Sequence, residues 1–502
     1  MNRFLSYYKI SFFFQGALLA LAFAPVFFWP ALLVLSVFAH YIRKAESIKL
    51  AAKYGLWFGF GFFTFSLYWI AIGVSVYIDD FWWALPFALF GLPFFLGFFI
   101  AITSAIAWRF RASPNYSLYF SLSWVLLEWI RSWIFTGFPW NLLGYSLCFS
   151  DELVQLGSVF GPYGMSFIVV YFMAGISCNA NKNSYLIFAL TSIISIISFG
   201  SWRLSHNPTS FTNTTIRIVQ PSISQEGKWS LEIFWKNLSD HVELSRINTG
   251  FNPDIILWPE AAVTAPYHTP SIQVMLKDSI ILPKTVLITG GITDNGKPGQ
   301  DYELYSGLYA LNYQGASLFE YHKSHLVPFG EYMPLKSFLP IKKLTHGLID
   351  YVPGVGAQVF DLRGLRIRPL VCYEAIFPSE VRGVNYDVLF NITNDAWYGN
   401  SSGPYQHLQI SRMRAVENGT PLVRAANNGI SAIIDPMGRV LAETKLNHIT
   451  ALDGIIPSRM QGHTLYSMFG EWMFIIIVVG MSCLRKIIEC IYSILYFLSL
   501  KR

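Results

Sequence analysis

Charged residues are scarce in this sequence. Asp, Glu, Lys and Arg make up 13% of its 502 residues, whereas 53% are hydrophobic and 17% are aromatic. Soluble globular domains carry about 25% charged residues, so this composition excludes an ordinary soluble chain. The sequence also has no internal repeats and no low-complexity tracts. We therefore predict a membrane protein.

The hydrophobic residues gather into blocks that match the thickness of a bilayer. A hydrocarbon core about 30 Å thick takes roughly 20 helical residues to cross. We predict about eight transmembrane helices: seven in a transmembrane domain at residues 1–204, and one in a C-terminal segment at 471–502 that ends in a cytoplasmic tail. The predicted spans are residues 10–24, 26–41, 56–77, 84–108, 118–135, 157–178, 185–202 and 472–484.

The first two predicted spans are short, and Pro25 and Pro30 lie at their junction. They form either a tight hairpin or two independent crossings. A secretory signal peptide is the alternative for the first block. Because no small-residue cleavage site separates it from the next long hydrophobic run, we expect the block to be retained.

Lys and Arg residues alternate between the two sides of the predicted spans. Short loops rich in these residues stay in the cytoplasm. Basic residues precede the first span and follow the second, fourth and last spans. They are Arg3, Lys9, Arg43, Lys44, Lys49, Lys53, Arg109, Arg111, Arg485, Lys486, Lys501 and Arg502. Loops of opposite parity are neutral or acidic, as in "YIDDFW". The polar segment at residues 205–470 is therefore predicted to lie outside the cytoplasm. Topology accounts for most of the net charge of +6, so we expect no nucleic-acid partner.

Residues 205–470 have a different residue pattern from the rest of the chain. Short β-branched runs alternate with turn signals and helical stretches, which predicts one mixed α/β domain. The candidate strands are "TIRIVQ", "DIILWPE", "TVLITGG", "SGLYALN", "GASLFEYHK", "LRIRPLVCYE", "DVLFNITND", "PLVRAANNG" and "SAIIDP". The candidate helices cover residues 231–247 and 404–418.

Cysteine is rare in this α/β segment. The chain has five cysteines, and Cys372 in "PLVCYEAIFP" is the only one within residues 205–470. Extracytoplasmic domains usually pair their cysteines, so a lone thiol is either an inert buried residue or a functional one. Cys372 ends a hydrophobic run, and α/β folds present site residues at the carboxyl ends of strands. This position favours a functional thiol.

Two other stretches place ionisable residues at or near predicted strand ends. In "DIILWPEAA", Glu260 follows an apolar strand and a Trp-Pro turn, and in "FEYHKSHLVPFGEY", Lys323 ends another strand while Glu331 lies at a Gly turn. One such residue is normally a solvated strand cap. A Glu, a Lys and a Cys together could supply a base, a cation that stabilises an oxyanion, and a nucleophile.

The three stretches around Glu260, Lys323 and Cys372 resemble the Glu-Lys-Cys signature of the nitrilase, or carbon-nitrogen hydrolase, superfamily. The membrane spans and the block "LLEWIRSWIFTGFPWNLLGYS" at residues 126–146 narrow the resemblance to the bacterial apolipoprotein N-acyltransferase family. The resemblance implies an α-β-β-α sandwich on the periplasmic side of the inner membrane, joined to an eight-helix membrane part. It also implies the last step of lipoprotein maturation, in which an acyl chain moves from a phospholipid to the N-terminal α-amine of a diacylglyceryl-cysteine apolipoprotein.

The resemblance also implies individual roles. Cys372 matches the family's nucleophile, Glu260 its general base and Lys323 its essential lysine. The supporting positions of the family fall on Glu331, Tyr373, Glu374 and Trp229. A thioester on Cys372 is then the expected intermediate, because the incoming amine attacks a thioester more readily than an oxygen ester.

Several alternatives remain open at this point. His322 and His325 flank Lys323, but no cysteine or acid cluster completes a metal site, so we expect neither a metal nor a cofactor. A Cys-His dyad would replace Glu260 as the base. Residues 332–353 mix apolar Phe338 and Leu339 with lysines, and form either a surface loop or an arm that touches the membrane.

Two other functional classes compete with the acyltransferase. A membrane-tethered amidase or nitrilase would use the same three residues on a soluble substrate, but it has no need for so many helices. A transporter whose outer domain only binds is weaker, because the spans carry few buried charges suited to an ion path. A requirement for a lipid acyl donor separates the acyltransferase from the amidase.

Overall fold

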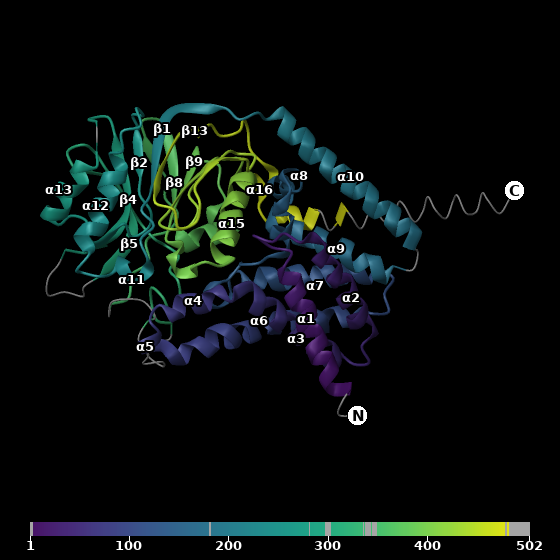
Figure 1. Cartoon of the computed structure of the whole chain (residues 1–502). Coiled ribbons are helices and arrows are strands. Elements are labelled where there is room, and N and C mark those ends of the chain that lie inside the picture. Colours follow the sequence, from purple (N-terminus) through teal and green to yellow (C-terminus); the bar gives the residue numbers. More distant parts are fainter. Residues whose placement is uncertain are drawn as a thin grey trace, which may run out of the picture.

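The structure is a computed structural model that describes residues 4–179, 182–280, 282–296, 303–334, 336, 343, 349–476, 479 and 480. Helices from the first part of the chain pack together on one side, and an α/β part lies beside them (Figure 1). The helical part contains α1 (Phe4–Ala20), η1 (Trp29–Leu33), α2 (Val34–Lys44), α3 (Ile48–Leu67), α4 (Trp69–Ser75), α5 (Ile78–Phe81), η2 (Trp82–Ala84), η3 (Phe87–Gly91), α6 (Leu92–Arg109), α7 (Tyr116–Arg131), η4 (Ile134–Thr136), η5 (Leu143–Phe149), α8 (Asp151–Val154), α9 (Gly157–Cys178) and α10 (Lys182–His206).

Several of these helices are apolar and long enough to cross a membrane. Within the described residues, three helical stretches meet this test: Ile78–Arg109, Gly157–Cys178 and Asn183–His206. A fourth is added if α3 and α4, which meet at a bend of 55°, form one broken span. Helices α1, α2 and α7 have 17, 11 and 16 residues, shorter than the roughly 20 of a straight crossing. The described helices therefore do not reach the predicted count of eight.

The boundaries of two predicted spans were wrong. The span at 118–135 continues too far, because α7 ends at Arg131 and the chain turns there. The Arg131 guanidinium donates to the carbonyls of Phe138 and Trp140, which holds this turn. The span at 56–77 begins too late and misses the bend, since α3 starts at Ile48. Of the predicted span at 472–484, residues 477, 478 and 481–484 lie outside the described residues.

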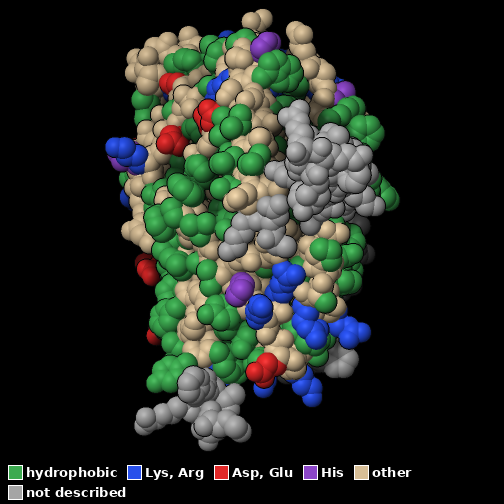
Figure 2. All heavy atoms as spheres, turned by 90° about the vertical axis from the view of Figure 1, so that its right-hand side faces the viewer, with side chains coloured by type: hydrophobic (Ala, Val, Ile, Leu, Met, Phe, Trp, Pro, Cys, Tyr) green, Lys and Arg blue, Asp and Glu red, His purple; other side chains and the backbone are tan. Residues whose placement is uncertain are grey.

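The surface of the helical part is strongly hydrophobic. Helix α10 exposes Ile187, Leu190 and Ile194 at 57%, 51% and 63%, which is costly in water and favourable in lipid. Figure 2 views the end of the molecule that faces away from the α/β part, and Lys and Arg side chains gather in its lower half. The exposed basic residues lie at the ends of α2 and α6, in the loop after α6 and in the first two turns of α3; they are Lys44, Lys49, Lys53, Arg109 and Arg111.

The α/β part contains two β-sheets. The first sheet has the order β13-β1-β2-β4-β5-β6, with β3 also paired to β4, and the second has the order β12-β11-β10-β9-β8-β7. The strands are β1 (Phe211–Gln220), β2 (Ile255–Leu257), β3 (Val263–Pro266), β4 (Val286–Asp294), β5 (Leu304–Leu311), β6 (Ser317–His322), β7 (Phe360–Leu362), β8 (Leu365–Val371), β9 (Val388–Thr393), β10 (Leu422–Ala426), β11 (Ala432–Ile434), β12 (Val440–Glu443) and β13 (Thr450–Pro457).

The two sheets pack face to face, with helices on their outer faces. Apolar side chains of both sheets, such as Ile218, Ile288, Val388 and Phe390, share one buried cluster. Helices α12 (Phe234–Ser245) and α13 (Pro270–Asp278) cover the first sheet, and α14 (Pro378–Val381) and α15 (Gly403–Asn418) cover the second. The remaining elements are α11 (Gln225–Lys228), η6 (Cys372–Ile376), η7 (Asp395–Tyr398) and α16 (Leu465–Phe469). The layers therefore form the expected α-β-β-α sandwich.

All nine predicted strands occur in the sandwich, but β3, β7, β12 and β13 were missed. The sequence of β13, "TALDGIIP", contains an acid and a glycine that break the strand pattern. In the fold, Asp453 of β13 forms an ion pair with the buried guanidinium of Arg217 on the neighbouring strand β1. Arg217 Nε lies 2.7 Å from Asp453 Oδ1. The partner that makes this acid acceptable lies more than two hundred residues earlier in the chain, so the local sequence gives no sign of it.

The loop after α7 joins the helical part to the sandwich. Tyr373 Oη donates to the carbonyl of Gly137 at 2.9 Å, and Trp140 Nε1 donates to Gln406 Oε1 at 2.8 Å. His325 Nε2 lies 2.9 Å from the carbonyl oxygen of Thr136. This loop therefore contacts the residue that follows Cys372, which places the end of β8 against the membrane helices.

Candidate active site

Cys372 lies at a sharp turn between β8 and η6. Its φ of +50° is in the left-handed region, which is unfavourable for a residue with a side chain and typical of functional turns. The neighbours of β8 in the sheet are β7 and β9, and only 6% of Cys372 is exposed. Cys372 belongs to the buried cluster that the two sheets share.

Lys323 is buried between two carboxylates. It follows β6 directly, and its Nζ lies 3.3 Å from Glu260 Oε1 and 2.8 Å from Glu331 Oε1, with 1% of the Lys323 side chain exposed. Burial alone lowers the pKa of Lys323, but the charges of Glu331 and Glu260 outweigh it and raise the pKa well above its usual value. Lys323 is therefore a fixed cation.

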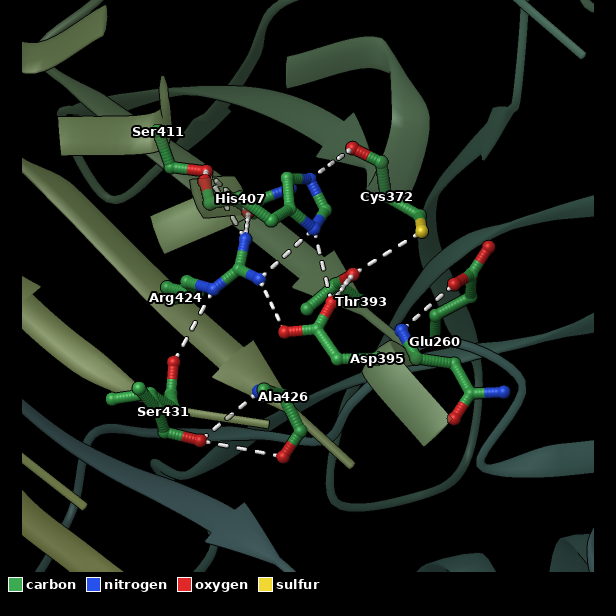
Figure 3. A network of polar contacts seen from close by, with 12 residues as sticks. Glu260, Cys372, Thr393, Asp395, His407, Ser411, Arg424, Ala426 and Ser431 are labelled. Atoms are coloured by element: carbon green, nitrogen blue, oxygen red, sulfur yellow. Dashed lines mark hydrogen bonds and ion pairs between the residues drawn. The ribbon is translucent and has the colours of Figure 1, made fainter. Parts of the chain in front are cut away.

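Glu260 follows β2 and is held from two sides. Its Oε1 faces Lys323, and its Oε2 accepts a hydrogen bond of 2.9 Å from the backbone N–H of Asn394. The Glu260 carboxylate and the Cys372 sulfur face a common space in Figure 3. The residues that the sequence placed at three separate strand ends, Glu260, Lys323 and Cys372, thus come together at one site.

The Cys372 thiol is neutral at physiological pH. Burial, followed by the nearby charge of Glu260, raises its pKa to about 12, although the Lys323 charge acts in the opposite direction. A neutral thiol is a weak nucleophile, so a base has to remove its proton during the reaction. Glu260 is the carboxylate placed to do so.

A buried polar network lies behind the sulfur (Figure 3). Thr393 Oγ1 is 3.2 Å from Cys372 Sγ and 3.0 Å from Asp395 Oδ1. Arg424 Nη2 donates to Asp395 Oδ2 at 2.7 Å, and His407 Nε2 lies 3.3 Å from the Cys372 carbonyl oxygen. Burial raises the pKa of Asp395, but Arg424 and His407 overcome this effect and lower it to about 2. Asp395 is therefore a permanent anion.

Glu374 ties the Lys323 loop to the Cys372 turn. Its Oε1 accepts from Tyr321 Oη at 2.7 Å, from Ser324 N at 2.7 Å and from Ser324 Oγ at 2.9 Å. Its Oε2 accepts from Val371 N at 2.7 Å. One carboxylate thus fixes the residues next to both Lys323 and Cys372, which positions the two relative to each other.

The other predicted supporting residues occupy distinct places. Glu331 contacts Lys323 and accepts a hydrogen bond of 2.7 Å from Val327 N. Tyr373 lies directly after the nucleophile and reaches the loop after α7. Trp229 is half-buried and follows α11, whose Gln225 accepts a hydrogen bond of 2.7 Å from Asn394 Nδ2.

Sequence reasoning missed several residues of this site. Lys228 is 3% exposed and its Nζ donates to the backbone carbonyl of Glu260 at 2.8 Å. Burial lowers its pKa to about 8, against the raising effect of Glu260. Thr393, Asn394 and Asp395 were also missed. They end the predicted strand "DVLFNITND", and polar residues at a strand end were the signal that identified Glu260 and Lys323.

The alternatives of the sequence analysis find little support in the described residues. Within them, no group of three or more His, Cys, Asp or Glu side chains could hold a metal ion. The hydrogen bond to Cys372 Sγ among the described residues comes from Thr393, and His407 contacts the backbone of Cys372 instead. Phe338, Leu339 and most of the proposed arm at 332–353 lie outside the described residues.

Two family models match the chain in succession. The apolipoprotein N-acyltransferase N-terminal domain matches residues 15–175, and the carbon-nitrogen hydrolase family matches residues 215–460. The second match contains Glu260, Lys323 and Cys372 together. The helical part and the sandwich each therefore have a counterpart among known families.

Three relatives match over nearly their whole length. An apolipoprotein N-acyltransferase from Rickettsia prowazekii is 50% identical over 95% of this chain and 98% of the relative. The enzyme of the same name from Rickettsia bellii is 52% identical over 94% of this chain and 95% of the relative. That from Rhodopseudomonas palustris is 36% identical over 94% of each.

Solved structures similar to the chain cover about half of it. A CN-hydrolase superfamily protein from Xanthomonas campestris has a TM-score of 0.37 and 18% identity, covering 48% of this chain and 90% of that one. An amidase from Nesterenkonia has a TM-score of 0.36 and 19% identity, covering 49% of this chain and 91% of that one.

Proposed function

The chain belongs to the apolipoprotein N-acyltransferase family, and we propose that it moves the acyl group through a thioester on Cys372. It is an acyltransferase that N-acylates lipoproteins during their maturation. The acyl donor in the proposal is a membrane phospholipid, and the acceptor is the N-terminal α-amine of a diacylglyceryl-cysteine apolipoprotein. The observation that carries the proposal is the meeting of a neutral thiol, a carboxylate and a fixed cation at the ends of β8, β2 and β6.

The first half-reaction acylates the enzyme. Glu260 accepts the thiol proton as the Cys372 sulfur attacks the ester carbonyl of the phospholipid. Lys323 and backbone N–H groups stabilise the tetrahedral oxyanion, a role that suits a cation whose charge does not change. The carbon–oxygen bond then breaks, the lysophospholipid leaves with the proton from Glu260, and a thioester remains on Cys372.

The second half-reaction transfers the acyl group to nitrogen. The α-amine of the apolipoprotein attacks the thioester, and Glu260 accepts the proton that the amine loses. The carbon–sulfur bond breaks, the amide leaves, and Glu260 passes the proton to the departing sulfur, which restores the thiol and the carboxylate. Burial of the site limits competing attack by water, because Cys372 and Glu260 are 6% and 8% exposed.

The supporting residues act on the geometry of the site. We assign Glu331 to hold the Lys323 ammonium, and Glu374 to fix the turns that carry Lys323 and Cys372. Tyr373 anchors the Cys372 turn to the loop after α7. We assign Trp229, the half-buried residue that follows α11, to contact with the acyl donor.

We also propose the arrangement of the chain in the bacterial inner membrane. Residues 1–204 form the transmembrane domain, 205–470 the periplasmic catalytic domain, and 471–502 a last span with a cytoplasmic tail. The gathering of Lys and Arg at the end away from the sandwich supports this orientation. The proposal keeps eight spans, counting α1, α2 and α7 as short or tilted crossings.

A transfer assay tests the proposed function. Purified enzyme receives a phospholipid with a labelled acyl chain and a diacylglyceryl peptide with a free α-amine. The labelled amide should form with the wild-type enzyme and should be lost in Cys372→Ala. Product without a phospholipid, or release of labelled fatty acid in place of the amide, would favour the amidase alternative.

A further inference from the structure

The hydroxyl of Thr393 lies between the Cys372 sulfur and a buried carboxylate (Figure 3). Its oxygen is 3.2 Å from Cys372 Sγ and 3.0 Å from Asp395 Oδ1. A hydroxyl carries one proton, so Thr393 can donate to only one of these atoms at a time. Thr393 and Asp395 are fully buried, so the two acceptors depend on protein donors.

The charge of Asp395 shows which acceptor Thr393 serves in the resting enzyme. Asp395 is an anion, whereas the resting Cys372 thiol is neutral. A charged acceptor forms the stronger hydrogen bond, so Thr393 donates to Asp395 Oδ1 in the resting enzyme. His407 Nδ1 lies 3.0 Å from the same oxygen, so Asp395 Oδ1 keeps a polar neighbour when Thr393 turns away.

The Cys372 sulfur becomes a stronger hydrogen-bond acceptor when it carries negative charge. The resting thiol is neutral and a weak acceptor. The sulfur carries negative charge as it loses its proton to Glu260, and again as it leaves the tetrahedral intermediate in the second half-reaction. Hydrogen bonds to charged acceptors are about twice as strong as neutral ones. Within the described residues, Thr393 is the side chain that donates to this sulfur.

We propose that the Thr393 hydroxyl is a catalytic hydrogen-bond donor that turns from Asp395 to the Cys372 sulfur whenever that sulfur carries negative charge. The step is a rotation of one hydroxyl, and no covalent bond of Thr393 forms or breaks. Asp395 keeps the hydrogen bond of 2.7 Å from Arg424 Nη2 to its other oxygen throughout. The thioester sulfur is again a weak acceptor, so the hydroxyl returns to Asp395 between the two half-reactions.

This inference rests on the proposed role of Cys372 as the nucleophile. It adds a group that acts on the sulfur, whereas Glu260 acts on the proton and Lys323 on the carbonyl oxygen. The same donor assists both half-reactions, because the sulfur passes through a charged state in each. Loss of the hydroxyl should therefore slow acylation and amide formation together, without a change in the KM for the phospholipid.

Two substitutions at position 393 separate the hydroxyl from the shape of the side chain. Thr393→Val has nearly the same shape but no hydroxyl, and Thr393→Ser keeps the hydroxyl. Thr285→Val is the matched control: Thr285 is also fully buried, donates to the Pro253 carbonyl at 2.7 Å, and precedes β4 at the end remote from Glu260. Thr393→Ala is a second variant without the hydroxyl, in case the valine disturbs folding.

The full-length enzyme in detergent is tested in two ways. Iodoacetamide alkylation of the Cys372 peptide at pH 8 reports thiolate formation without any lipid, and acyl-enzyme formation from phosphatidylethanolamine reports the first half-reaction. We expect Thr393→Val and Thr393→Ala to slow both rates about 10- to 100-fold, which matches one hydrogen bond to a charged group. Thr393→Ser should stay within about threefold of wild type, and Thr285→Val within about twofold.

Two results would overturn the proposal: rates for Thr393→Val within twofold of wild type, or Thr393→Ser as slow as Thr393→Val. Cys372→Ala is measured alongside in the transfer assay. If it still forms the amide, the proposed function itself fails, whereas an inactive Cys372→Ala with an unaffected Thr393→Val overturns the role of Thr393 alone.

Discussion

Glu374→Gln should weaken the site through the geometry of its two strand-end turns. Glu374 is 2% exposed, and its carboxylate accepts hydrogen bonds from Tyr321, Ser324 and Val371. A glutamine that keeps its carbonyl oxygen toward Tyr321 and Ser324 points its NH2 group at the Val371 N–H. Val371 then has a buried N–H without an acceptor, which costs about 1–3 kcal/mol.

The lost charge adds to this cost. The hydrogen bonds that remain at Oε1 change from charge-assisted to neutral, and each becomes roughly half as strong. Together the two effects amount to about 3 kcal/mol. In a domain of 150–250 residues, each 1 kcal/mol lowers Tm by about 2–4 °C, so Glu374→Gln should lower the Tm of the catalytic part by roughly 6–12 °C.

Thermal unfolding followed by tryptophan fluorescence in detergent measures this shift. Glu380→Gln is the matched control, because the Glu380 side chain is 41% exposed and contacts His325 at 2.8 Å. An exposed pair contributes about 0–1 kcal/mol, so the control should change Tm by no more than about 3 °C. Acyl-enzyme formation by Glu374→Gln should also slow about 100-fold, as expected for a displacement of about 1 Å between reacting groups. A Tm shift below 2 °C, or equal shifts in the two variants, would refute the role assigned to Glu374.

Four further predictions concern the site and the membrane topology. Glu331→Gln should slow acyl-enzyme formation about 10- to 100-fold, because Lys323 loses a charge-assisted hydrogen bond of 2.8 Å; a rate within twofold of wild type would contradict the assignment. Since the pKa of Cys372 is raised to about 12, the thiolate fraction grows about tenfold per pH unit. Iodoacetamide alkylation of Cys372 should therefore rise from pH 7 to pH 10 without levelling, whereas a plateau below pH 9 would show a lower pKa. Glu260→Gln removes a charge that raises this pKa, so alkylation at pH 9 should accelerate while acyl transfer slows; parallel changes would argue against Glu260 as the base. A cysteine in place of Asn295 should react with a membrane-impermeant thiol reagent in intact spheroplasts, and labelling only after lysis would place the sandwich in the cytoplasm.

The sequence predicts the parts of this protein that depend on local patterns. Alternating β-branched runs identify the strands, and polar residues after those runs identify Glu260, Lys323 and Cys372. These residues come together because the strands that precede them end at the same side of the sandwich. Pattern and chemistry are therefore sufficient for nine of the strands and for the three residues that we assign to catalysis, whereas the layers of the sandwich were implied by the family resemblance.

The rest depends on partners that are distant in sequence. Asp395 is fully buried because Arg424 lies beside it, and neither residue by itself indicates a buried ion pair. Lys228 reads as a surface lysine in "QEGKW", but its ammonium reaches the Glu260 carbonyl. The bend between α3 and α4 occurs inside a continuous hydrophobic run, so hydropathy does not reveal it. Local sequence carries no information on these long-range contacts.

The most direct test of the account is the mass of the enzyme after incubation with a phospholipid and no apolipoprotein. We predict that intact-protein mass spectrometry shows one added acyl group on Cys372. Neutral hydroxylamine should remove this group, as it cleaves thioesters, and Cys372→Ala should not acquire it. An unmodified wild-type enzyme that releases free fatty acid under these conditions would contradict the proposed thioester and favour simple hydrolysis.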